Sequence, residues 1–389
     1  MTEQAFATGQ REASQDDSAW RHVSLPSLPD IPAMTKLAER QMFYWMTRDR
    51  YTGAGAVVEL GCWLGAGTAA LAAGLRDRGR PARLVAVDRF VWKGPANSRV
   101  TRAGLMDGDD FEPMFRANIQ PLEDWIEPVR ADLEEFHWDR GPIEILVVDA
   151  PKRPKAVASF LDRFGPALIP GRSLIAFQDY LHEPSYALPA LLACCGDALR
   201  LMDVALPGST ALFEVRGTPV LEAKQRDLNP MRWPAGDTVR HWQKNVIAPL
   251  PPEARIAARI SLAMMLYDQG HKGEALDELS QAPDRAALAR RMLGLAEKST
   301  FVRYRKLFRA MDVLPRRLRH ERQVREARDH LKAGRLDEAG RSCLAVLAAE
   351  PQHRKAVSLM AKIERERHPW RRSVRALERF FGRAWSQHA

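Results

Sequence analysis

The chain has 389 residues, of which 46% are hydrophobic and 28% are charged, and its formal net charge is +10. This length suffices for two or three domains, and the composition is that of a globular protein rather than of a disordered or fibrous one. The four cysteines include no C-x-x-C pair, which argues against a zinc site or a disulfide framework and favours a reducing cytosol.

Residues 1–34 are expected to form a flexible or loosely docked N-terminal arm. The first 30 residues are polar and have neither a basic start nor an apolar stretch, so no signal peptide is expected. No run of 18 or more apolar residues occurs along the chain, so no membrane-spanning helix is expected either. We therefore predict a cytoplasmic protein.

From residue 35 onward, short apolar strands alternate with helical segments. Helices are predicted over 35–48, 68–79, 111–119, 155–168 and 186–196. Strands are predicted at AVVEL (56–60), RLVAVD (83–88), EPVRAD (127–132), IEILVVD (143–149), RSLIAFQD (172–179), LRLMDVA (199–205) and STALFEV (209–215). Continuous apolar strands separated by helices indicate a parallel sheet that is covered on both faces.

The last two predicted strands are joined only by Leu206, Pro207 and Gly208. This connection is too short for a parallel crossover, so the two strands are expected to pair antiparallel. The fold class that follows is α/β: a Rossmann-like, doubly wound sheet over residues 35–220, mostly parallel with one antiparallel strand. An all-α region is expected after it.

That C-terminal region begins after a proline-containing linker, which is predicted over residues 221–252. The rest, 253–389, has only helical patterns. The spacing Ala-x6-Gly-x4-Ala occurs at Ala263 and again at Ala327. Small residues so placed let two helices of a hairpin touch, with glycine at the turn. Either a degenerate repeat array or a small helical domain packed on the first domain fits this pattern.

The positive charge is concentrated near the C-terminus. Residues 301–389 contain 23 Lys and Arg against 10 Asp and Glu. Within them, residues 370–385 have helical periodicity, with an apolar stripe beside several arginines. This segment suits a packing helix, a contact with a protein partner, or peripheral contact with an anionic membrane. Nucleic acid is the least favoured partner, because no recognised binding motif accompanies the arginines.

The segment that carries the chemistry is VELGCWLGAGT, residues 58–68, which ends a strand and opens a helix. Its spacing E-x-G-x-x-x-G-x-G is neither the dinucleotide fingerprint nor a P-loop. Glycines remove side chains where a ligand must approach the backbone, and the helix start offers free N–H donors. The residues assigned here to cofactor binding are Glu59, Gly61, Cys62, Trp63, Gly65, Gly67 and Thr68.

Two further carboxylates follow the next two strands. Asp88, at the tip of the second strand, can accept hydrogen bonds from both hydroxyls of a ribose, and Asp132 after the third strand is suited to an adenine amino group. Glu59 can serve the cationic amino-acid end of S-adenosylmethionine, and Trp63 either covers that end or packs against Trp45. Together these positions predict S-adenosylmethionine as the cofactor.

These motifs resemble the class I S-adenosylmethionine-dependent methyltransferases, with VELGCWLGAGT, LVAVDRF, IEILVVDAP and LIPGRSLIAFQDY as the matching segments. The likeness is greatest to the sugar O-methyltransferase subgroup and covers about 180 residues. The C-terminal helices resemble tetratricopeptide repeats. The resemblance implies methylation of a sugar, a glycan or another secondary-metabolite hydroxyl.

The resemblance also implies where the acceptor is handled. Asp149 and Asp179 stand where the subgroup has acidic residues, whereas Pro151-Lys152 and Gln178 depart from its pattern. Two carboxylates are a thin oxygen shell for a divalent cation, so the sequence leaves metal use open. Lys152 or His182 could deprotonate a hydroxyl. The departures also allow an alternative, a methyltransferase-like domain without turnover that acts as a scaffold through its helical C-terminal region.

Overall fold

A computed structural model describes residues 17–79, 81–93, 105–149, 153–220, 229–296, 303–304, 307–308 and 316–367. The chain divides into two compact units, residues 1–282 and 283–389. The domain boundaries expected from the sequence, at 35–220, 221–252 and 253–389, remain predictions.

The first unit is built on a seven-stranded sheet with the order β3-β2-β1-β4-β5-β7-β6. Its strands are β1 (Ala56–Leu60), β2 (Leu84–Asp88), β3 (Ile126–Arg130), β4 (Ile143–Val148), β5 (Leu174–Phe177), β6 (Leu199–Ala205) and β7 (Thr210–Val215). Strands β1 to β5 pair in parallel, and β7 runs antiparallel to both β5 and β6. The predicted fold class and the antiparallel finish are confirmed.

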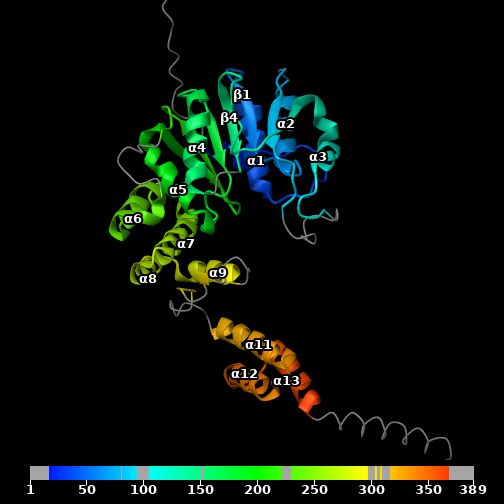
Figure 1. The fold of residues 1–389 in the computed structure, drawn as a ribbon, viewed down its shortest axis with the longest axis vertical. Helices are drawn as coiled ribbons and strands as arrows, with labels where there is room; N and C mark the ends of the chain where they lie inside the picture. The colour runs from blue at the N-terminus through cyan, green and yellow to red at the C-terminus, as the bar shows by residue number, and fades with distance from the viewer. Residues whose placement is uncertain are drawn as a thin grey trace, which may run out of the picture. The chain divides into compact units, whose positions relative to one another are not determined.

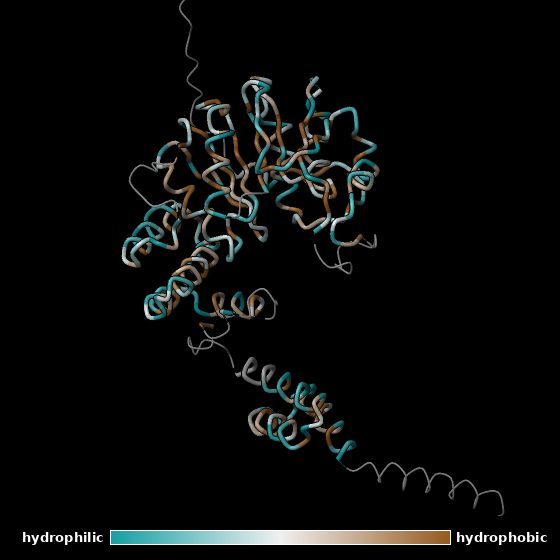
Figure 2. The backbone as a smooth tube through the Cα atoms, in the orientation of Figure 1, coloured by the Kyte–Doolittle hydropathy of each residue, from teal (hydrophilic) through white to brown (hydrophobic). Residues whose placement is uncertain are grey.

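Helices cover both faces of this sheet, and Figure 2 shows the strands as predominantly hydrophobic segments between them. On one face, α1 (Leu37–Trp45) and α2 (Ala66–Arg78) join a buried core with alternate residues of the strands, such as Val57 and Ala86. On the other, α4 (Pro154–Phe164) contacts the sheet through Phe160, whose ring lies 5.7 Å from that of Phe177 on β5. Helix α3 (Glu112–Ile119) adds Phe115 and Ile119 to the core of α1 and α2, whereas α5 (Ala187–Leu192) packs against α4 (Figure 1).

The segment before α1 is packed against the first unit from residue 17 on. Trp20 is only 1% exposed, and its indole N–H donates to Asp203 on β6 over 2.9 Å. Arg21 makes a 2.7 Å ion pair with the same carboxylate. The carboxylate that holds Trp20 lies more than 180 residues further along the chain. No local sequence pattern therefore predicts that this segment packs here.

After the sheet the chain is helical, as expected. Helices α6 (Ala235–Trp242), α7 (Pro252–Asp268) and α8 (Lys272–Ser280) complete the first unit (Figure 1). The hydroxyl of Tyr186 donates to Asp268 at the end of α7 over 2.8 Å. The α7–α8 hairpin is thus attached to the sheet domain.

The described part of the second unit contains α9 (Arg285–Ala296), α11 (Arg316–Lys332), α12 (Leu336–Ala349) and α13 (Arg354–Arg367). The last three enclose a core that includes Ala327, Ala339 and Ile363. The basic segment 370–385 that the sequence singles out lies outside the described residues.

The repeated spacing marks two hairpins with the same turn. Gly270 and Gly334 both adopt positive φ, 92° and 72°. Each donates from its N–H to the carbonyl three residues earlier, and the next residue donates five residues back. The four alanines of the two repeats are fully buried. The hairpins that the spacing predicts are therefore present, while their likeness to tetratricopeptide repeats stays a prediction. None of the described helices is long and apolar enough to cross a membrane.

Candidate functional site

The predicted site residues gather at one edge of the sheet, beyond the carboxyl ends of its parallel strands. Backbone hydrogen bonds continue the ladders past the strand ends: Gly61 donates to Val87 over 2.8 Å, and Asp149 donates to Leu60 over 2.9 Å. Gln178 likewise donates to Val148 over 2.9 Å. Glu59, Gly61, Asp88, Asp132, Asp149 and Asp179 therefore belong to one edge.

The strand order reverses between β1 and β4, since β2 and β3 lie on one side of β1 and β4 and β5 on the other. Ligands of open α/β sheets bind in the crevice at such a switch point. Here it holds a hollow of about 30 Å³, lined by Met34, Thr35, Glu59, Gly61, Cys62, Trp63, Ala66, Gly67, Asp149 and Gln178. Its residues come from both sides of the switch point and from the segment before α1.

Two larger hollows, of about 310 and 300 Å³, lie elsewhere in the described part of the chain. One is lined by Leu201 of β6 and Phe213 of β7 together with the helical segment around Lys244. The other is lined by Arg83 and Ile126, at the amino ends of β2 and β3. Position at the switch point, rather than volume, identifies the candidate site, because only there do glycines and carboxylates of successive strand ends converge.

Glu59 is the buried carboxylate of this hollow. It is 1% exposed, and the hydroxyl of Thr68 at the start of α2 donates to it over 2.6 Å. Burial raises the pKa of Glu59 to about 8; the carboxylates of Asp149 and Asp88 add to the increase, and the hydrogen bond from Thr68 opposes it. A cation in the hollow would favour the ionised form, since an opposite charge lowers the pKa of a carboxyl group.

The glycines keep the space beside Glu59 open. A Cβ on Gly67 would lie 2.7 Å from Oε1 of Glu59, and one on Gly61 would lie 3.4 Å from Cβ of Asp149. Gly65 caps α2 with a φ of 96°, and a side chain there would meet Ile119 at 2.8 Å. Glycine is thus required at these positions for different purposes. Gly61 and Gly67 border the hollow, and Gly65 makes the turn before α2.

Cys62 and Trp63 form the outer part of the glycine-rich loop. Cys62 is buried, and burial, with the nearby carboxylates of Asp88 and Glu59 adding to it, raises the pKa of its thiol well above the ordinary value. The thiol is therefore uncharged and serves as a packing group. Trp63 has a φ of 46° and stacks on Trp92 with ring centroids 5.9 Å apart, so its aromatic neighbour is Trp92 rather than the alternative, Trp45.

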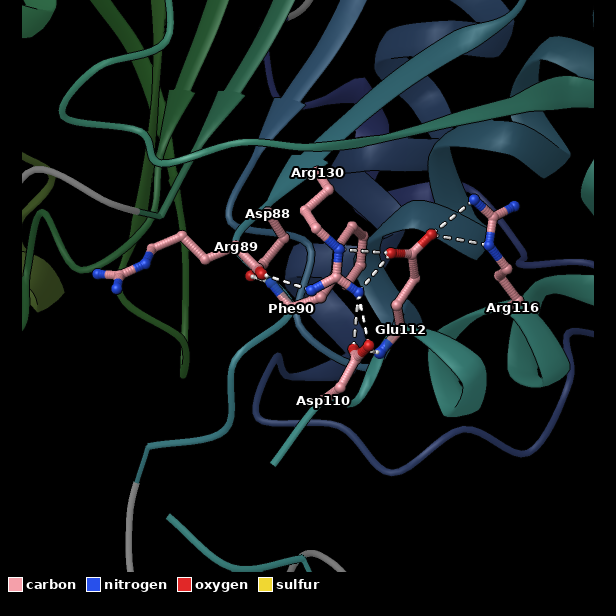
Figure 3. A network of polar contacts seen from close by, with 7 residues as sticks. All are labelled: Asp88, Arg89, Phe90, Asp110, Glu112, Arg116 and Arg130. Atoms are coloured by element: carbon pink, nitrogen blue, oxygen red, sulfur yellow. Dashed lines mark hydrogen bonds and ion pairs between the residues drawn. The ribbon is translucent and has the colours of Figure 1, made fainter. Parts of the chain in front are cut away.

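Asp88 links the tips of β1 and β2. Its carboxylate accepts hydrogen bonds from the backbone N–H groups of Trp63, over 3.0 Å, and Phe90, over 2.9 Å. Figure 3 shows the network beside it, in which Arg130 at the end of β3 binds Asp110 and Glu112. These contacts hold the loop after β2 near both of its ends, and the two backbone donors fix the carboxylate of Asp88 in place.

Asp132 lies just beyond β3, where the sequence places an adenine contact. Its carboxylate accepts from the N–H of Glu134 over 2.9 Å and lies 3.5 Å from the guanidinium of Arg89. It is therefore close to the residue that follows Asp88, on the β2–β3 side of the edge.

The residues that the sequence predicts to handle the acceptor follow β4 and β5. Asp149 lines the hollow, and Asp179 has a φ of 59°, an uncommon conformation for a residue other than glycine. The hydroxyl of Ser209 lies 3.4 Å from the Asp179 carboxylate, and Nδ1 of His182 lies 3.1 Å from the hydroxyl of Ser185. Lys152 lies outside the described residues.

Among the described residues, no group of three or more His, Cys, Asp or Glu side chains is arranged to hold an ion. Asp149 and the amide of Gln178 line the hollow at the switch point.

Two residues of the site have no signal in the sequence motifs. Thr35 lines the hollow from the segment before α1. Glu39, on the first turn of α1, is 4% exposed and accepts hydrogen bonds from Ser209 and Thr210 at the start of β7. Both look like ordinary residues of an amphipathic helix, so only the tertiary structure identifies them.

A family model described as a methyltransferase domain matches residues 58–180, the span from β1 to the end of β5. No curated protein matches the chain. Among solved structures, the O-methyltransferase NovP is 15% identical, with 48% of this chain and 82% of that one covered and a TM-score of 0.39. The methyltransferase PaMTH1 of Podospora anserina, bound to SAH, is 14% identical, with coverages of 47% and 80% and a TM-score of 0.35. OxaC, in complex with SAH and oxaline, is 16% identical, with 47% of each chain covered and a TM-score of 0.31.

Proposed function

We propose that this chain is an S-adenosylmethionine-dependent O-methyltransferase that acts on a hydroxyl of a small molecule, such as a sugar, a glycan unit or a secondary metabolite. One observation carries the proposal. The switch point of a methyltransferase-domain sheet has a buried carboxylate, Glu59, beside glycines that leave room for a ligand, with Asp88 at the next strand tip.

The residues fit the parts of this cofactor. Glu59 would hold the ammonium of its amino-acid end, and Asp88 the ribose hydroxyls, with Asp132 beyond them toward the adenine. A hollow of about 30 Å³ can take only a small group, whereas whole ligands of this size need roughly 300 Å³ or more. We infer that the amino-acid end enters the hollow and that the nucleoside lies along the open edge past Asp88.

When bound, S-adenosylmethionine supplies a methyl group on a cationic sulfur, which leaves as a neutral thioether. The acceptor hydroxyl gains that methyl group and loses one proton, so a base of the protein must take the proton. Asp149 and Asp179 are the carboxylates that would orient the hydroxyl, and His182 or Lys152 would take the proton. Because the reaction is an in-line displacement, positioning supplies much of the rate.

Calorimetric titration with S-adenosylhomocysteine tests the cofactor assignment. The unmodified chain should bind it, whereas Asp88→Ala and Gly61→Arg should abolish binding. Asp139→Ala, which changes an exposed carboxylate before β4, is the matched control and should bind normally. If the unmodified chain does not bind, the alternative is favoured, a scaffold protein that works through its helical C-terminal region.

A second experiment addresses the acceptor. The chain is incubated with methyl-labelled S-adenosylmethionine and a panel of sugars, phenols and amines, and products are identified by mass spectrometry and NMR. We expect O-methyl products. N-methyl products alone would overturn the O-methyltransferase assignment while leaving the cofactor assignment intact.

A further inference from the structure

Thr35 presents a buried hydroxyl to the switch-point hollow. Its Oγ1 is excluded from solvent and has no hydrogen-bond partner in the part of the chain that the structure describes. Thr35 lines the hollow together with Glu59 and Gly67. Buried hydroxyl groups are nearly always hydrogen-bonded in folded proteins, because an unsatisfied one loses its hydration without compensation. A ligand group in the hollow would supply the missing partner.

The segment that carries Thr35 is held by a buried carboxylate. Glu39 accepts a hydrogen bond from the N–H of Lys36 over 2.7 Å, which fixes the start of α1 immediately after Thr35. The other carboxylate oxygen of Glu39 accepts from the N–H of Ser209 over 3.0 Å and from the hydroxyl of Thr210 over 2.7 Å. The segment before α1 is thereby fastened to the start of β7, 170 residues further along the chain.

The side chain of Glu39 packs closely against the backbone before β7. A Cβ on Gly208 would lie 2.3 Å from the carboxyl carbon of Glu39, so the backbone before β7 lies directly against that carboxylate. Ser209 also contacts the acceptor side, since its hydroxyl lies 3.4 Å from Asp179. Glu39 therefore joins the segment over the hollow to the loop that contacts Asp179.

We propose that Thr35 is a cofactor-binding residue whose hydroxyl hydrogen-bonds the amino-acid end of the adenosyl cofactor, and that Glu39 is the positioning residue that holds it there. This inference rests on the proposed function. It assigns a cofactor contact to the chain before α1, outside the methyltransferase match, which begins at residue 58. The amino-acid end is the relevant part because Thr35 shares its hollow with Glu59, whereas Asp88 is not among the residues that line it.

The test compares two ligands that differ in that end. S-adenosylhomocysteine has the amino-acid end, and 5′-methylthioadenosine lacks it. By calorimetry on the full chain, Thr35→Val should weaken S-adenosylhomocysteine binding by about 10- to 150-fold, as expected for one hydrogen bond to a charged group. Binding of 5′-methylthioadenosine should stay unchanged. Thr35→Ser, which keeps the hydroxyl, should restore most of the affinity.

A matched control separates the contact from a general effect of removing an unsatisfied hydroxyl. Thr238 on α6 is fully buried, and its Oγ1 also has no partner among the described residues, but it does not line the hollow. Thr238→Val should leave both affinities unchanged. Glu39→Gln should weaken S-adenosylhomocysteine binding while thermal denaturation shows a folded protein.

The outcomes are distinguishable. If the unmodified chain binds S-adenosylhomocysteine and Thr35→Val binds it equally tightly, the assignment of Thr35 is wrong and the proposed function stands. Equal losses for the two ligands would also overturn it, since a contact with the amino-acid end cannot affect a ligand without one. If the unmodified chain binds neither ligand, the proposed function itself fails.

Discussion

The two halves of the candidate site differ in how their polar groups are supported. At the tips of β1 and β2, Glu59 and Asp88 are held by donors from the glycine-rich loop, the start of α2 and the residue two places after Asp88. At the tip of β5, Asp179 is contacted by Ser209, which Glu39 of α1 holds in turn. Glu59 and Asp88, the carboxylates proposed for the cofactor, are therefore supported locally, whereas Asp179, proposed for the acceptor, depends on segments that are distant in the chain.

This difference predicts that substitutions in the two halves impair different steps, cofactor binding and turnover. Changes in the first half should remove binding of the cofactor, because every group there is already in place around a small space. Changes of the Asp179 carboxylate itself should leave cofactor binding intact and reduce turnover. The predictions that follow test this separation, beginning with the largest expected effect.

Gly67→Ala should weaken S-adenosylhomocysteine binding by roughly 100-fold or more, which corresponds to about 2.7 kcal/mol. The added Cβ would lie 2.7 Å from Oε1 of Glu59 and would displace the carboxylate or fill the space beside it. Gly273→Ala is the control, since that glycine of α8 has no atom within 4 Å of its would-be Cβ. Calorimetry measures both, and equal affinities would contradict the role given to the glycine.

Asp179→Asn should lower turnover by about 10- to 100-fold, the lower part of the range for groups that assist proton transfer. It should leave S-adenosylhomocysteine affinity nearly unchanged, because Asp179 is not among the residues that line the hollow proposed for the cofactor. Steady-state kinetics and calorimetry on the same preparation test this split. A parallel loss of cofactor affinity would show that the two halves are not separable.

Cofactor binding should depend on pH through Glu59, whose pKa is about 8 in the ligand-free protein. Below that value the carboxyl group is mostly protonated and must release its proton to pair with an ammonium group. Affinity for S-adenosylhomocysteine should therefore rise by up to about 10-fold per pH unit between roughly pH 6 and 8. Calorimetry in buffers of different ionisation enthalpy should detect the released proton.

Glu59→Gln provides the control for that experiment, since it should remove both the pH slope and the proton release. A slope that persists in this variant would assign the titration to another group and would weaken the case for Glu59 as the partner of the ammonium.

The smallest expected effect concerns stability. Because the pKa of Glu59 is raised above its ordinary value, the folded state binds more protons than the unfolded state between about pH 4.5 and 8. Stability contributed by the protonated form is therefore lost as the pH rises through this window. Glu59→Gln should raise the melting temperature of the ligand-free protein by several degrees at about pH 9 and have little effect near pH 4. Glu253→Gln, an exposed position at the start of α7, should change neither value.

Local sequence predicts much of the fold and the convergence of several carboxylates at one edge of the sheet. The strands were predictable because each is a short, continuously apolar run, and the antiparallel finish followed from the short connection between the last two predicted strands. In a parallel sheet the carboxyl ends of neighbouring strands meet at one edge, so Glu59, Asp88 and Asp149 could be expected together from their positions at strand ends alone.

Local sequence could not decide which distant side chains complete the site. Thr35 and Glu39 precede the glycine-rich motif, and Glu39 finds its partners 170 and 171 residues later. Trp63 stacks on Trp92 because the loop after β2 returns to the glycine-rich loop. Spacing along a strand or helix determines which residues share a face, but contacts between segments far apart in the chain arise only when the whole sheet and its helices have packed.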